Sequence, residues 1–85
     1  VEFLDMQGIS VLGLRPGGRA GEFDTVRGEA FFQSVGFAQA VLQGRSDEQG
    51  DKFAGIQQTP FGRYFYVSGP IFDPAGAQVG ALLVG

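Results

Sequence analysis

The chain contains neither cysteine nor histidine among its 85 residues. Without cysteine it has no disulfide framework and no thiolate nucleophile. Without histidine it lacks the commonest general base and the commonest ligand of transition metals. A catalytic site would need a carboxylate pair or a serine–lysine pair, and no spacing in the sequence suggests either. We therefore expect a protein that is not an enzyme, with no cofactor and no metal site.

Basic residues and long hydrophobic runs are also scarce. Six Lys and Arg residues stand against nine Asp and Glu residues, which gives a net charge of −3. This balance argues against nucleic-acid binding, which uses a basic surface. No stretch reaches the roughly 20 apolar residues of a membrane-spanning helix, and no signal peptide is visible. The sequence indicates one small domain over residues 1–85, and 44% of its residues are hydrophobic.

Glycine, by contrast, is abundant, with fifteen residues. The C-terminal third of the sequence predicts a β-hairpin. Residues 63–72 are rich in aromatic and β-branched side chains, and residues 78–84 form a second apolar run. The Asp-Pro-Ala-Gly of residues 73–76 supplies a turn between them. A hairpin of the same plan is predicted across residues 1–14, with its Asp-x-x-Gly turn at residues 5–8.

A helix is predicted between the two hairpins, at residues 29–43. Its apolar side chains recur at helical spacing and its polar side chains cluster on the opposite side. The apolar stripe consists of Phe31, Val35, Ala38, Val41 and Leu42. Residues 15–28 and 44–51 are expected to be loops, and residues 52–59 a further strand.

The resulting order of strand, strand, helix, strand, strand, strand resembles the extracytoplasmic Cache domains, which are PAS-like sensor modules of bacterial receptors. The matching motifs are Gly-Pro-Ile at residues 69–71, Asp-x-x-Gly at residues 73–76 and Val-Gly-Ala-Leu-Leu-Val-Gly at residues 79–85, together with Leu-x-Gly at residues 42–44 and Gly-Asp-Lys at residues 50–52. The resemblance implies an α+β fold with a PAS-like five-stranded antiparallel sheet and one main helix between strands 2 and 3. Such domains usually open with a long helix, and since this sequence begins directly at the first predicted strand, we expect that helix to be missing or cut away.

The resemblance also implies a function. The chain would be a fragment of a longer, membrane-anchored signalling receptor, and its location would be extracytoplasmic, either periplasmic or extracellular. A small molecule would bind between the sheet and the helical segment, under a lid formed by residues 15–28 and 44–51. The alternative is a ligand-free structural or dimerisation module of the same fold, in which Phe31, Phe37 and Tyr66 plug the cavity. If the opening helix is absent, one sheet face has lost its cover, and we expect a homodimer or higher oligomer that buries this face.

The first candidate ligand-binding residues lie on the predicted strand 63–72. Tyr64, Tyr66 and Ser68 alternate onto one face of this strand, with Arg63 beside them. Two phenol groups, a hydroxyl and a guanidinium suit a small anionic or zwitterionic ligand. The alternative is that the tyrosines are packing residues and that Arg63 is solvated.

A second candidate group surrounds the predicted start of the strand at residue 52. Lys52 would pair with an anionic group of the ligand and Asp51 with an amine, across the sheet from the tyrosines. The acids Asp47, Glu48 and Asp51 also provide oxygen ligands of the kind that Ca²⁺ or Mg²⁺ prefers, but they lack the spacing of a known loop motif. The alternative for the whole group is a solvated loop.

Overall fold

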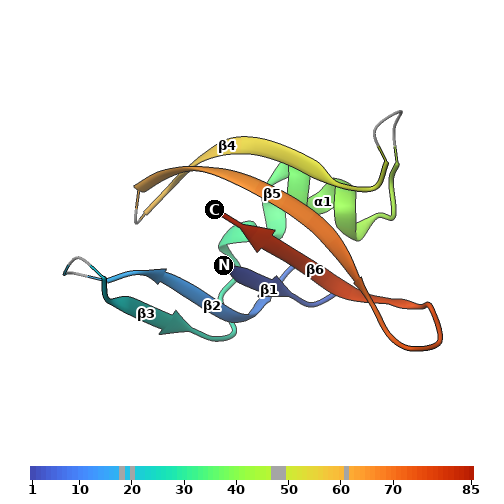
Figure 1. The fold of residues 1–85 in the computed structure, drawn as a ribbon, viewed down its shortest axis with the longest axis horizontal. Helices are drawn as coiled ribbons and strands as arrows, with labels where there is room; N and C mark the ends of the chain where they lie inside the picture. The colour runs from blue at the N-terminus through green and yellow to red at the C-terminus, as the bar shows by residue number, and fades with distance from the viewer. Residues whose placement is uncertain (18, 20, 47–49, 61) are drawn as a thin grey trace.

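The computed structural model describes residues 1–17, 19, 21–46, 50–60 and 62–85. They form one six-stranded sheet with a short helical segment against one of its faces (Figure 1). The strand order is β3-β2-β1-β6-β5-β4, and every pair of neighbours is antiparallel. The first and last strands pair with each other in the middle of the sheet, so the two ends of the chain lie close together.

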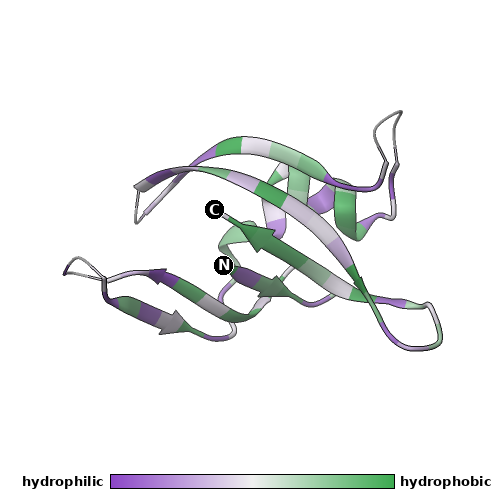
Figure 2. Ribbon diagram, viewed as in Figure 1, coloured by the Kyte–Doolittle hydropathy of each residue, from purple (hydrophilic) through white to green (hydrophobic). Residues whose placement is uncertain are grey.

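The elements in chain order are β1 (Glu2–Leu4), β2 (Ser10–Pro16), β3 (Phe23–Val26), the 3-10 helix η1 (Phe31–Ser34), α1 (Gly36–Leu42), β4 (Phe53–Thr59), β5 (Gly62–Phe72) and β6 (Gln78–Val84). Hydrophobic residues occupy the C-terminal half of β6, in the centre of the sheet (Figure 2). No helix in the described part of the chain is long and apolar enough to cross a membrane.

The two predicted Asp-x-x-Gly turns are confirmed, and they are built in the same way. The carboxylate of Asp5 accepts hydrogen bonds from the backbone N–H groups two and four residues ahead. Asp73 does the same in the turn between β5 and β6. The fourth residue of each turn is a glycine with a φ of 84° or 90°, a left-handed conformation that costs glycine little. Local side-chain chemistry therefore positions both hairpins.

The predicted PAS-like α+β fold is wrong. The five expected strands are present within two residues of their predicted ends, but the sheet has a sixth strand, β3, at its edge. We predicted these four residues as part of a loop. β3 forms because its backbone pairs with β2, from Pro16 opposite Phe23 to Gly13 opposite Val26. A four-residue edge strand has little periodicity of its own, so the partner strand determines its conformation.

The predicted main helix over residues 29–43 is also wrong in length. Residues 31–34 form a 3-10 turn, Val35 is extended with φ −79° and ψ 127°, and α1 has only seven residues. Glu29 is not helical, because its backbone forms a β-bridge with Ser10 and its carboxylate accepts a hydrogen bond from the N–H of Phe31. A β-branched residue followed by Gly36 then favours a break at Val35. The molecule is mostly sheet.

The hydrophobic core lies between the sheet and the segment η1–α1. Its buried members are Leu4, Phe32, Val35, Ala38, Val41, Tyr66, Ala81 and Leu83. The rings of Phe31 and Phe32 meet edge to face with centroids 5.0 Å apart, and Phe37 packs over Gly55 of β4. The helical segment therefore covers the face that β4, β5 and β6 turn toward it, and Leu4 of β1 joins the same core.

Gly80 of β6 tests how closely the first and last strands approach each other. A Cβ at this position would overlap the carbonyl oxygen of Leu4, which belongs to the backbone and cannot rotate away. We expect Gly80→Ala to lower the free energy of unfolding by about 1–3 kcal/mol, the usual cost of overpacking. The measurement is urea denaturation followed by circular dichroism.

Gly36→Ala is the matched control, because no other group lies within 4 Å of a Cβ at this first position of α1. Alanine is the better helix former, so this variant should gain up to about 1 kcal/mol. Equal effects of the two substitutions would contradict the close approach at Gly80.

Candidate functional site

The residues predicted to bind a ligand do not form one cluster. Tyr64, Tyr66 and Ser68 point from β5 toward the helical segment, as their alternation predicts. Arg63 is exposed and belongs to the opposite face, because side chains along a strand alternate. Lys52 borders that opposite face as well, since it extends the register of β4 to lie beside Gly69 of β5.

Tyr66 is part of the core. Its side chain is 3% exposed, its ring meets Phe32 edge-on at 5.3 Å, and it stacks on Phe37 at 5.9 Å. Tyr64 is half-buried beside it, with ring centroids 6.2 Å apart. These contacts support the packing interpretation of the tyrosines.

Ser68 is buried, and its hydroxyl makes a structural hydrogen bond. Its Oγ lies 2.8 Å from the carbonyl oxygen of Phe53 and 3.3 Å from that of Phe37. Because a serine hydroxyl has one proton to donate, the nearer carbonyl is its main acceptor. This bond ties β5 to the start of β4, and the more distant carbonyl of Phe37 places α1 on the same side of the strand, away from Lys52.

The aromatic rings fill the space between the sheet and the helical segment. Two cavities open beside this space. One of about 260 Å³ is lined by Tyr64 and Tyr66, together with Leu14, Pro16 and Phe23 of the hairpin β2–β3. A smaller one of about 130 Å³ lies at the C-terminal end of α1, between Val41 and Phe72. The rings of Phe32 and Phe37 thus fill the space beside Tyr66 under the helical segment, while the cavity beside Tyr64 and Tyr66 opens toward the hairpin β2–β3.

The other face of the sheet, turned away from α1, is the outer face. Register and alternation place on it the apolar side chains of Phe3, Leu12, Ala54, Ile56, Phe65, Val67, Ile71, Leu82 and Val84. Among the strand residues that the structure describes, Arg63 is the one charged residue on this face. Ile56 is 60% exposed and Phe65 is 58% exposed. This is an uncovered hydrophobic surface.

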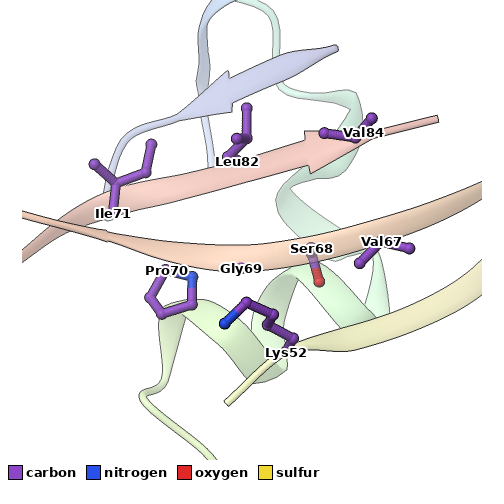
Figure 3. A pocket seen from close by; sticks show the side chains of 8 residues that line it. All are labelled: Lys52, Val67, Ser68, Gly69, Pro70, Ile71, Leu82 and Val84. Carbon is purple, nitrogen blue, oxygen red and sulfur yellow. The ribbon is translucent and has the colours of Figure 1, made fainter. Parts of the chain in front are cut away.

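A hollow of about 300 Å³ lies in the outer face (Figure 3). Gly69 of β5 lies at its centre, between Lys52 before β4 and Leu82 of β6. Because glycine has no side chain, the outer face is hollow between these two residues. Val67 and Ile71 flank it along β5, and Leu82 and Val84 flank it on β6. Lys52 extends along its rim, and its Nζ lies 3.3 Å from a carboxylate oxygen of Asp51. Of the predicted ligand residues, Lys52 and the backbone of Ser68 line this hollow.

The buried polar cluster of the domain was not predicted. The carboxylate of Glu2, which is 1% exposed, accepts hydrogen bonds from Ser10 at 3.0 Å and from Arg15 at 2.8 Å. Arg15 also pairs with Glu29 and lies over the ring of Phe32, 5.9 Å from its centroid. Burial by itself would lower the pKa of Arg15, but its bonds to the two carboxylates raise that pKa above the ordinary value.

A sequence signal for this cluster existed. Glu2 shares its strand face with Leu4, so a charged residue occupies the alternation position of a core residue. Gly13 stands opposite it on β2 and leaves the room that the carboxylate fills. A buried charge of this kind requires a partner, and Arg15 lies two residues beyond that glycine.

No group of three or more acidic, cysteine or histidine side chains could hold a metal ion within the described ranges. Asp47 and Glu48, two of the three suggested cation ligands, lie outside the described residues. The chain shows no significant match with any protein-family model, any curated protein or any solved structure. The resemblance to Cache domains therefore stays a prediction.

Arg15 should be essential for stability, because it neutralises the buried carboxylate. We expect Arg15→Met to cost about 3–5 kcal/mol, the usual penalty for leaving one buried charge without its partner. The double variant Glu2→Gln with Arg15→Met removes both charges, so its free energy of unfolding should fall by less than that of Arg15→Met. Urea denaturation of the two variants measures the difference, and a double variant that is less stable than Arg15→Met would contradict this role.

Tyr66 should ionise late. Burial, and secondly the nearby Glu2 carboxylate, raises the pKa of Tyr66 to about 12. A tyrosine in an unfolded chain ionises near pH 10, so between pH 10 and 12 the unfolded chain loses a proton that the folded chain keeps. The contribution of the neutral Tyr66 side chain to the free energy of unfolding is therefore complete below pH 10 and is lost as the pH rises from 10 through 12.

The variant Tyr64→Phe isolates this titration, because the chain has two tyrosines. The phenolate absorbance of the remaining Tyr66 should rise with a midpoint near pH 12 while circular dichroism still reports the folded sheet. A midpoint near pH 10 in a folded chain would show that Tyr66 is open to water.

Proposed function

We propose that this domain is an association module, which packs the outer face of its sheet against a second copy of the chain. The observation that supports the proposal is the row of exposed apolar side chains across the sheet, above all Ile56 and Phe65. Soluble monomers rarely expose contiguous apolar patches beyond a few hundred Å². Covering this face removes apolar surface from water, which stabilises the complex by a free energy of roughly 25 cal/mol per Å² of apolar area.

The distribution of charge suits a second copy as the partner. Arg63 and Lys52 lie toward opposite ends of the pair β4–β5, so the rows between them carry no charge. Two such faces can pack together without burying an unpaired charge, while both cations stay in water. The chain measures 39 × 25 × 21 Å, and a face of a molecule this size can supply the roughly 800 Å² per partner of a standard interface.

The filled space between sheet and helical segment favours the same proposal. A ligand between Tyr66 and the helical segment would have to displace the Tyr66 ring from its contacts with Phe32 and Phe37. A plugged cavity is the property by which a structural or dimerisation module differs from a sensor. The extracytoplasmic sensor role, with its membrane-anchored receptor, rests on the resemblance and stays a prediction.

Phe65→Glu tests the interface. Placing a carboxylate in the centre of the outer face should raise the dissociation constant of the dimer at least thirtyfold, the effect of losing a hot-spot contact of about 2 kcal/mol. Sedimentation velocity over a concentration series measures this constant. The wild-type chain should sediment as a dimer at high concentration and dissociate on dilution.

Phe72→Glu is the matched control. Phe72 lies on the same strand and is 54% exposed, close to the value for Phe65, but it lines the cavity at the end of α1 instead of the outer face. The control should dimerise like the wild type. A wild-type chain that remains monomeric at high concentration, or equal effects of the two substitutions, would overturn the proposal.

A further inference from the structure

We propose that the hollow around Gly69 is a binding site for a small monocarboxylate with an apolar body. The inference goes beyond association, because the hollow is complete within a single chain (Figure 3). A second copy on the outer face would cover it, so the site is to be measured where the chain is monomeric.

The shape of the hollow results from one missing side chain. Gly69 stands between Lys52 and Leu82 in a row across the sheet, where any other residue would project outward. A Cβ built at position 69 would have its nearest neighbour, the Cγ of Lys52, at 3.5 Å, which is an ordinary contact. The backbone therefore does not demand glycine here, since no left-handed conformation and no steric conflict requires it. A volume of about 300 Å³ is at the small end for ligand sites.

The walls determine the body of the ligand. Val67, Ile71, Leu82 and Val84 surround the hollow with aliphatic groups. The hydroxyl of Ser68 does not contribute a polar contact, because it points to the far side of the strand and is bound to backbone carbonyl groups. An aliphatic or aromatic group is therefore the part of a ligand that fills this space.

The rim determines the head group. Lys52 reaches along the hollow with its aliphatic stem, so the ammonium group stands at the edge of an apolar cavity. Its present partner, Asp51, lies at 3.3 Å, and the two side chains are 71% and 46% exposed. Exposed pairs of this kind are weak, so a ligand carboxylate can bind the ammonium group in competition with Asp51. Asp51 lines a different cavity and adds no negative charge to the walls of the hollow.

The experiment is an NMR titration of the isotope-labelled chain with phenylacetate and with isovalerate, at a dilution at which sedimentation shows a monomer. Saturable shifts are expected at the backbone amides of residues 67–69, 71 and 82–84, since Pro70 has no amide proton. Phenylacetamide, which has the same ring and no charge, should bind about two- to fivefold more weakly than phenylacetate.

Three variants identify the site. Gly69→Val fills the hollow, should fold with an unchanged or higher unfolding midpoint because valine suits a strand, and should lose at least tenfold in affinity. Lys52→Gln should weaken phenylacetate binding about two- to fivefold and leave phenylacetamide binding unchanged. Asp51→Asn should instead strengthen phenylacetate binding, because it removes the competing carboxylate.

Arg63→Gln is the control for general electrostatic attraction, since Arg63 lies on the same face but outside the hollow. It should not alter the affinity. The inference is overturned if neither carboxylate gives saturable shifts, if the shifts spread over the whole outer face, or if a folded Gly69→Val chain binds phenylacetate like the wild type. None of these results depends on whether the chain dimerises at high concentration.

Discussion

The contact between Phe32 and Tyr66 holds the helical segment against the sheet. Phe32 is fully buried in η1, and Tyr66 stands in the middle of β5, so their edge-on packing at 5.3 Å joins two elements that are distant in sequence. The guanidinium of Arg15 lies over the same Phe32 ring and extends the contact to the buried carboxylate of Glu2. The hydrophobic core and the ion cluster therefore meet at one aromatic side chain.

This packing covers only one face of the sheet in the described part of the chain. A seven-residue α1 and a 3-10 turn can cover a single face of a six-stranded sheet, and the opposite face stays apolar and exposed. Burial of that face against a partner is the physical basis of the proposed association. The hollow at Gly69 belongs to the same face, so a ligand there and a second copy would compete for one surface. Any activity that depends on this face would thus be sensitive to both.

Alternation along β5 predicts that Tyr64, Tyr66 and Ser68 share one face, as observed, and the same rule places Arg63 on the other face. The burial of Glu2 cannot be predicted from its own strand, because a single charged residue in a three-residue strand has the pattern of an exposed residue. Its burial becomes evident only when Gly13 of the neighbouring strand provides the space for its carboxylate.

The turns at Asp5 and Asp73 and the strands beside them follow from the local sequence, because an aspartate that binds its own backbone and a run of β-branched residues act over a few positions. The strand at residues 23–26, the break of the helix at Val35 and the hollow at Gly69 depend on tertiary contacts. Each of these features depends on which strand or side chain arrives from elsewhere in the chain. Local propensity is weak at such positions, and the free energy of pairing and burial between distant segments exceeds it.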